Sequence, residues 1–276
     1  MDTFTHVSYQ HARSLTLHYS SSFGLSSRLF TARIRLHIYA VYGLVRIADE
    51  IVDTYRGNNQ KQLLDELEAE TYAAIKRQYS PHPIVHAFAL TAQKYGINSE
   101  LIAPFFKSMR MDLEHRDYTP AMYDEYIHGS AEVIGLMCLR VFCEGNDTLY
   151  AQLETGARSL GAAYQKVNFL RDMAADYRQL GRVYFPSVDA EHFSAREKRH
   201  IIEDSKADFA AAKTALDHLP RGAKTAVMTS YEYYNELLQL LEAASPNEIM
   251  EHRISVPSWR KLWIMIRTIA MTWRPW

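Results

Sequence analysis

LVRIADEIVDTY, residues 44–55, places two carboxylates four positions apart in a run that is otherwise apolar and helical in its spacing. On an α-helix Asp49 and Asp53 share one face, with about 5–6 Å between their Cβ atoms. Two like charges so placed repel each other, and apolar neighbours raise the cost of burying them. Taken alone, the pattern favours a plain explanation: one carboxylate pairs with Arg46 and the other is exposed.

A second pair with the same spacing occurs in QKVNFLRDMAADYRQLGRVYFP, residues 165–186. One polar stripe follows this predicted helix at intervals of three and four positions: Gln165, Asn168, Asp172 and Asp176. A solvated stripe can have this spacing, but Gln and Asn are not typical of a face that is merely exposed. Two facing helices with paired carboxylates indicate a divalent-metal site.

Magnesium is the metal that such a site favours. Mg²⁺ takes octahedral oxygen ligands, usually one or two protein carboxylates completed by water and phosphate oxygens. Two carboxylate pairs across a cavity therefore predict about two or three Mg²⁺ ions around a diphosphate, with Mn²⁺ as an alternative. Bound ions make diphosphate a better leaving group. Arg46 and Arg171, close to the aspartates in sequence, are placed to contact phosphate oxygens.

The composition indicates an all-α chain. Its 276 residues include only 11 Gly and 9 Pro, and few runs alternate β-branched residues as strands do. Helices are expected at 8–20, 27–55, 61–78, 82–95, 98–115, 120–143, 147–179, 192–216, 222–243 and 256–272. Most breaks between them are short, and no low-complexity linker or repeat occurs, so one domain is expected over 1–276.

Charge and cysteine content exclude several classes of protein. The net charge of -1 gives no basic footprint for nucleic acid. Cys138 and Cys143 are expected to be reduced core residues, which fits a reducing compartment. The N-terminus lacks the apolar core of a signal peptide, and no stretch approaches the ~20 apolar residues of a spanning helix. A soluble, cytoplasmic protein is therefore expected, at most peripheral to a membrane.

These motifs resemble those of the squalene and phytoene synthase family, the head-to-head prenyl synthases, in the same order and over nearly the whole chain. The similar segments are YSSSF (19–23), YAVYGLVRIADEIVD (39–53), MRMDLEHRDY (109–118), YIHGSAEVIG (126–135) and NFLRDMAADYRQLGRVYFP (168–186). The last segment is the most specific, because it includes the trailing Gly-Arg-x-Tyr-x-Pro. Three positions depart from the family pattern, Glu132, Lys166 and Ala175, and they put the substrate preference in doubt.

The resemblance implies an all-α bundle of the isoprenoid synthase type with a central cavity, and it assigns roles by position. Magnesium ligands would be Asp49, Asp53, Asn168, Asp172 and Asp176. Substrate and diphosphate contacts would come from Ser20, Ser22, Arg46, Tyr126, Gln165, Asn168, Arg171 and Arg253. Tyr234 would act in catalysis together with the four aspartates.

The resemblance also implies the reaction: Mg²⁺-dependent 1'-1 condensation of two prenyl diphosphates through a cyclopropyl diphosphate. Two geranylgeranyl diphosphates giving phytoene, in carotenoid biosynthesis, are favoured because the chain lacks a C-terminal extension and because Ser27 is small where a bulky residue could close the cavity. NADPH is not expected. The alternative within the family is a C30 relative, a dehydrosqualene or squalene synthase that uses farnesyl diphosphate.

Two further alternatives come from other classes. A terpene cyclase or head-to-tail prenyl synthase usually shows a DDxxD-type cluster, and residue 48 is Ala. A non-catalytic helical relative should have lost metal ligands, and all four aspartates are present.

The C-terminal stretch SWRKLWIMIRTIAMTWRPW, residues 258–276, contains all four tryptophans and no acidic residue. Packing of this segment on the bundle is the plainer interpretation. An amphipathic helix with Trp and Lys or Arg is also typical of a segment at a membrane interface. The sequence therefore predicts, as its second interpretation, a peripheral and salt-sensitive contact with anionic lipid.

Overall fold

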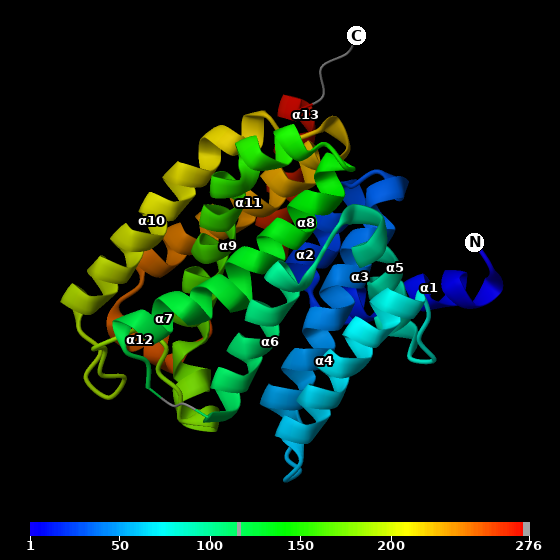
Figure 1. Cartoon of the computed structure of the whole chain (residues 1–276). Coiled ribbons are helices and arrows are strands. Elements are labelled where there is room, and N and C mark those ends of the chain that lie inside the picture. The colour runs from blue at the N-terminus through cyan, green and yellow to red at the C-terminus, as the bar shows by residue number, and fades with distance from the viewer. Residues whose placement is uncertain (115–116, 273–276) are drawn as a thin grey trace.

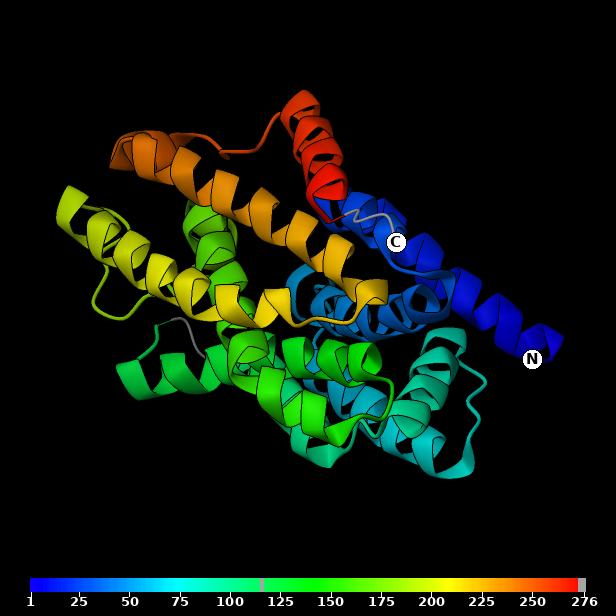
Figure 2. The ribbon, with the colours of Figure 1, turned by 90° about the horizontal axis from the view of Figure 1, so that it is seen from above.

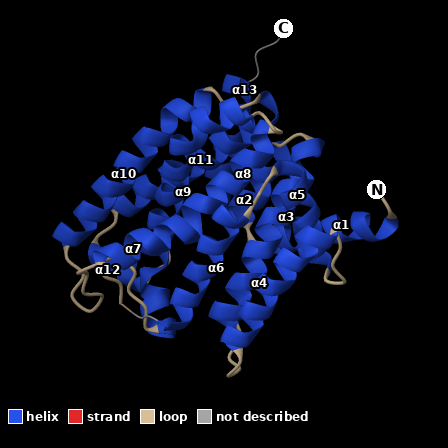
Figure 3. Ribbon diagram, viewed as in Figure 1, coloured by secondary structure: helices blue, strands red, loops and turns tan. Residues whose placement is uncertain are grey.

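A computed structural model describes residues 1–114 and 117–272 of the chain, and these residues form an all-α fold (Figures 1 and 3). In this part of the chain the β-type pairing consists of one isolated parallel bridge between Asp117 and Val183. The fold class predicted from the sequence is confirmed.

The N-terminal half packs around α3, which spans Ala32–Asp49 and continues into η2, a π-helical turn over Glu50–Thr54. The other elements of this half are α1 (Thr3–Tyr19), α2 (Ser21–Ser26), the 3-10 turn η1 (Ser27–Leu29), α4 (Gln60–Arg77), α5 (Pro83–Tyr95) and α6 (Ser99–Glu114). Their apolar faces meet in a first core, in which Leu44, Phe88 and Phe106 are fully buried.

The C-terminal half is arranged around the long helix α9, Asp147–Ala175, which packs against α8 and α10. Its other elements are α7 (Pro120–Ile127), the π-helical turn η3 (His128–Glu132), α8 (Val133–Cys143), the π-helical turn η4 (Asp176–Leu180), α10 (Ala195–Asp217), α11 (Arg221–Ala243), α12 (Pro246–Glu251) and α13 (Ser258–Thr272). A second core contains Val167, Leu170 and Leu238. Viewed from above, α13 lies at the edge of the bundle beside α11 (Figure 2).

The predicted helix over 27–55 is wrong at its start. The chain forms the turn η1 there, directly after α2, and begins α3 only after Thr31, whose N–H donates to the carbonyl of Gly222 at 3.1 Å. The short helix α12 was not predicted, although Ser245 and Glu248 form a capping box that starts it.

Two of the long helices end in a π-helical turn, and each junction carries an aspartate pair. Asp49 is the last residue of α3, while Asp53 lies in η2; Asp172 lies in α9, while Asp176 opens η4. The sequence spacing predicted a regular α-helix through both pairs, so the wider turns correct that prediction. π-helical turns are rare, and they are frequent at functional sites.

One helical stretch among the described residues, Pro120–Cys143, is long and apolar enough to cross a membrane by length and composition. The sequence had predicted none. Because 67% of its most apolar window is buried inside the protein, it is accounted for as a core segment of the bundle.

Candidate active site

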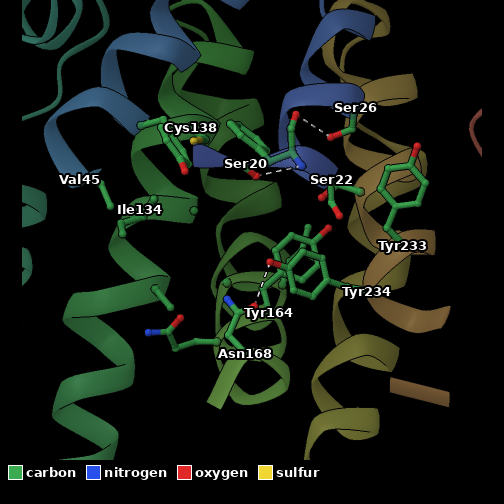
Figure 4. A pocket seen from close by; sticks show the side chains of 18 of the residues that line it. Ser20, Ser22, Ser26, Val45, Ile134, Cys138, Tyr164, Asn168, Tyr233 and Tyr234 are labelled. Atoms are coloured by element: carbon green, nitrogen blue, oxygen red, sulfur yellow. Dashed lines mark hydrogen bonds between the residues drawn. The ribbon is translucent and has the colours of Figure 1, made fainter. Parts of the chain in front are cut away.

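A cavity of about 980 Å³ lies between the two cores, with walls from α2, α3, α8, α9, α11 and the segment that joins α12 to α13 (Figure 4). The lining changes from apolar to polar along the two helices that carry the aspartates. On α3 it runs from Ile38 to Asp49, and on α9 from Leu153 to Asp172. The carboxylates therefore gather where the C-terminal ends of these two helices meet.

Every side chain that the resemblance assigned to the site lines this cavity. The predicted residues on its wall are Ser20, Ser22, Arg46, Asp49, Asp53, Tyr126, Gln165, Asn168, Arg171, Asp172, Asp176, Tyr234 and Arg253. The fold thus brings together residues from the whole length of the chain. Their individual roles stay predictions.

The first aspartate pair has little compensating charge beside Asp49. Its nearest guanidinium, that of Arg46, lies 3.9 Å from Asp49 Oδ2 and makes its close contact with Glu50 instead. The same guanidinium lies 4.2 Å from the ring centroid of Tyr19. Burial and the neighbouring charge of Asp53 raise the pKa of Asp49 to about 7. This end of α3 therefore has negative charge that a bound cation would stabilise.

In the second pair, the charge of Asp172 is compensated by two neighbouring arginines. Asp172 Oδ1 accepts hydrogen bonds from Arg171 Nε at 3.0 Å and from Arg253 Nε at 2.7 Å. Although burial opposes ionisation, these two guanidinium groups hold the pKa of Asp172 below its usual value. Burial and the charges of Asp172 and Asp53 raise the pKa of Asp176 to about 7. Because the charge of Asp53 helps to raise the pKa of Asp176, the two pairs lie close enough to interact and face each other.

Arg182 is a buried cation that the sequence analysis did not assign. It is 2% exposed, and its Nη1 donates to Asp53 Oδ1 at 2.8 Å. Its Nη2 donates to the carbonyl of Asp112 at 2.8 Å. The segment after η4 is thereby joined to η2 and α6, and one oxygen of Asp53 is fixed in place.

Asp112 is a fifth carboxylate on the cavity wall, and the sequence analysis did not assign it. It is buried, and it accepts hydrogen bonds from Tyr126 at 2.7 Å and from Tyr184 at 2.9 Å. Burial, only partly offset by Arg182, raises the pKa of Asp112 to about 6. Two quoted motifs could have indicated these residues. Arg182 and Tyr184 belong to Gly-Arg-x-Tyr-x-Pro, and Asp112 belongs to the acidic segment at 109–118.

The amide side chains of the polar stripe are held by neighbouring hydroxyls. Tyr234 donates to Asn168 Oδ1 at 3.2 Å, and its ring stacks on Tyr164 with 4.0 Å between centroids (Figure 4). Gln165 Nε2 donates to Ser130 Oγ at 3.3 Å. Asn168 therefore presents a fixed amide to the cavity beside an aromatic pair.

Lys261, at the start of α13, adds a third cation to this wall and was also missed. Burial and the positive charges of Arg171 and Arg253 lower its pKa. A group of three cations around the single carboxylate of Asp172 fits the binding of an anion such as diphosphate.

Ser27 corrects the expectation about cavity depth. Its side chain is buried behind the wall, where Oγ donates to the carbonyl of Gly24 at 3.0 Å and lies 3.3 Å from the hydroxyl of Tyr39. The neighbouring Ser26 lines the cavity and Ser27 does not. The prediction that Ser27 keeps the cavity deep is therefore wrong.

The departures from the family pattern lie outside the cavity wall. Lys166 is buried between α9 and α10, where it pairs with Asp204 at 2.6 Å and Asp208 at 2.7 Å. Glu132 pairs with Arg158 at 2.7 Å. These charges hold helices together instead of contacting a ligand in the cavity.

The donors present fit a magnesium ion that shares its shell with substrate. Among the residues that the structure describes, no three His, Cys, Asp or Glu side chains form a metal site by themselves. Magnesium usually takes one or two protein carboxylates and completes its shell with water and phosphate. Asp49 and Asp176, whose pKa values are raised by burial and by neighbouring carboxylates, are oxygen donors of that kind.

Residues 16–260 match the sequence model of the squalene/phytoene synthase family. The chain belongs to this family. Its members are prenyltransferases, so the terpene-cyclase and non-catalytic alternatives are set aside.

Curated relatives and solved structures agree with this assignment. The chain is 26% identical to the phytoene synthase of Arthrospira platensis, over 92% of this chain and 90% of that one. It is 28% identical to the 15-cis-phytoene synthase of Synechocystis, over 92% and 82%. A dehydrosqualene synthase structure superposes with a TM-score of 0.83 at 19% identity, covering 97% of both chains. A squalene synthase from Alicyclobacillus acidocaldarius gives 0.74 at 20% identity, over 87% and 94%. At such identities the structures show the fold, which is the isoprenoid synthase type.

Proposed function

We propose that this protein catalyses the Mg²⁺-dependent head-to-head condensation of two geranylgeranyl diphosphates to phytoene, as a cytoplasmic step of carotenoid biosynthesis. The observation that carries the proposal is the cavity. Its apolar part suits prenyl chains, and the aspartates and basic side chains meet at its polar part.

The side chains that would hold magnesium are Asp49, Asp53, Asn168, Asp172 and Asp176. When bound, magnesium makes the diphosphate a better leaving group. At this end of the cavity the chain also supplies positive charge for the phosphate groups. Arg171, Arg253 and Lys261 are placed to bind phosphate oxygens, with Arg46 and the hydroxyls of Ser20 and Ser22 at the opposite wall.

In the proposed reaction, the double bond of one substrate attacks C1 of the other as its diphosphate leaves, and loss of a proton gives a cyclopropyl diphosphate. That intermediate then loses its own diphosphate and a second proton as it rearranges to the hydrocarbon. The apolar wall excludes water, which would quench the cation. The faces of Tyr164 and Tyr234 provide electron-rich surfaces that stabilise positive charge.

The choice of the C20 substrate is supported by two observations. Phytoene synthases are among the relatives that match over most of the chain. The cavity is also large, at about 980 Å³, and it has an apolar part that suits long prenyl chains.

Incubating the purified protein with C15 or C20 diphosphate, each with and without NADPH, tests the proposal. We expect phytoene from the C20 substrate in the presence of Mg²⁺, with no effect of NADPH. A C30 hydrocarbon formed in preference would instead assign the protein to the dehydrosqualene and squalene synthases.

A further inference from the structure

The helix α13 exposes an apolar stripe along its outer side. Its members follow each other at helical intervals of three, one and three positions and are between 50% and 67% exposed: Trp259, Leu262, Trp263 and Ile266. On the opposite side, Ile264 and Thr268 are buried, and α13 packs against α11. Packing on the bundle therefore uses only one side of the helix.

A stripe of this kind is unusual on a monomeric soluble protein. Two tryptophans and two large aliphatic side chains at this exposure form a patch of several hundred Å², a size at which an apolar patch often marks a binding surface. The residues that follow α13, which include Trp273 and Trp276, lie outside the described part of the chain. The stripe is defined by the four residues above.

The arginines of α13 are engaged by α11. Arg260 Nη1 lies 2.5 Å from Glu236 Oε1, and Arg267 Nη2 lies 2.6 Å from Glu232 Oε2. These ion pairs belong to the α11–α13 contact. The same guanidinium groups lie over the rings of Trp259 and Trp263, at 5.4 and 5.0 Å from the ring centroids, so cations border the stripe. Because each of them is paired with a glutamate, the charge beside the stripe is largely neutralised.

The stripe begins at the wall of the cavity. Ser258 and Lys261, in the first turn of α13, line the cavity, while the intervening Trp259 is the most exposed member of the stripe. Figure 2 shows α13 at the edge of the bundle, where its outer side is not covered by another helix. A surface that receives this stripe would therefore lie beside the wall formed by residues 255–261.

We propose that the α13 stripe docks on a lipid bilayer by burying its apolar side chains at the interface, with little contribution from charge. Tryptophan at the headgroup level with aliphatic side chains beneath it is the usual composition of such a face. This placement rests in part on the proposed function, because prenyl substrates and a hydrocarbon product would be exchanged with lipid next to the cavity. A second copy of the chain is disfavoured as the occupant, because a stable dimer buries about 800 Å² per partner.

Vesicle flotation of the full-length protein tests this proposal. We expect the protein to float with vesicles of phosphatidylcholine alone, and the bound fraction to change less than about twofold between roughly 0.05 and 0.5 M NaCl, because screening weakens only exposed charge contacts. Trp259→Gln with Trp263→Gln should reduce partitioning at least about tenfold. Both side chains are more than half exposed, so the fold should tolerate the change.

The matched control is Val7→Gln with Tyr55→Gln, which removes two exposed apolar side chains outside α13, one in α1 and one directly after η2, and should leave flotation intact. Failure of the unaltered protein to float with neutral vesicles overturns the proposal. So does concentration-dependent dimerisation that the Trp259→Gln, Trp263→Gln variant abolishes, since the stripe would then be a subunit interface. Flotation is read without substrate, so a protein that floats but makes no hydrocarbon would contradict the proposed function alone.

Discussion

The aspartate pair at the end of α3 and the pair at the end of α9 have the same spacing and the same π-helical turn, but their counter-charges differ. In the first pair the second member, Asp53, is fixed by Arg182 from a distant segment. In the second pair the first member, Asp172, is held by Arg171 and Arg253.

Each pair therefore combines one compensated carboxylate with one that still lacks a close cation. The uncompensated members, Asp49 and Asp176, are those whose pKa values rise to about 7. Repulsion within a cluster of carboxylates is relieved either by protons or by metal ions. Asp53 and Asp172 are thus oriented by the protein itself, whereas Asp49 and Asp176 depend on a bound cation to stay ionised.

The largest expected effect is on turnover. Asp49→Asn, Asp53→Asn, Asp172→Asn and Asp176→Asn should each lower kcat by about 10²–10³ or more, the scale seen when one charge-stabilising group is lost from an active site. Product formation from labelled prenyl diphosphate measures the loss, and circular dichroism should show unchanged helix content. Near-normal turnover in two or more variants would show that the aspartates are not metal ligands.

A second prediction separates the two kinds of carboxylate by metal-linked stability. Mg²⁺ together with a diphosphate analogue at about 100 times its Kd should stabilise the folded protein by about 2.7 kcal/mol, because it binds only the folded state. Asp49→Asn with Asp176→Asn should remove most of the corresponding rise in Tm.

The control for that experiment is Asp147→Asn with Asp217→Asn, which alters two exposed carboxylates outside the cavity. It should keep the full shift in Tm. A full shift in the Asp49→Asn, Asp176→Asn variant as well would place the ions elsewhere in the protein.

A third prediction compares the arginines beside the two pairs. Arg253→Gln should raise KM for the diphosphate substrate by about 10–100-fold, since a hydrogen bond to a charged group contributes about 1.5–3 kcal/mol. Arg46→Gln should raise it less, because Arg253 also holds Asp172, a proposed magnesium ligand, whereas the close partner of Arg46 is Glu50, which has no proposed role. Arg140→Gln, which breaks an ion pair outside the cavity, serves as the control. Equal effects of Arg46→Gln and Arg253→Gln would remove the distinction between the two sites.

Local periodicity explains which of these features the sequence could predict. The polar stripe on α9, including Asn168 and Asp172, follows from helical spacing alone. Arg182 could not be placed in the same way, because its partner Asp53 is 129 positions away and only the fold joins them. Ser27 was misplaced because it lies in the turn η1, where helical periodicity no longer fixes the direction of a side chain.

The π-helical turns were missed for a related reason. The choice between a hydrogen bond to the fourth or to the fifth preceding residue depends on packing around the helix end. Tyr55 N–H donates to the carbonyl of Glu50 at 2.9 Å, five positions back, and no residue type in the sequence marks that choice.

The last expected effect concerns stability in the absence of metal. Asp49 and Asp176 have pKa values of about 7 in the folded protein, against about 3.9 for an unfolded Asp. Between these values the folded state binds more protons than the unfolded state, so the free energy of unfolding falls as pH rises from about 4 through 7. Asparagine at both positions carries no charge and should abolish this contribution.

Melting curves in EDTA between pH 5 and pH 8 measure that difference. We expect the Asp49→Asn, Asp176→Asn variant to gain stability relative to the unaltered protein as pH rises, and to exceed it at pH 8. Buried histidines such as His37, whose pKa burial lowers to about 4, titrate in both proteins and cancel in the comparison. Adding Mg²⁺ with a diphosphate analogue at pH 8 should reverse the order, because only the unaltered protein keeps both carboxylates. Parallel curves without metal would mean that Asp49 and Asp176 are compensated in solution as fully as Asp53 and Asp172.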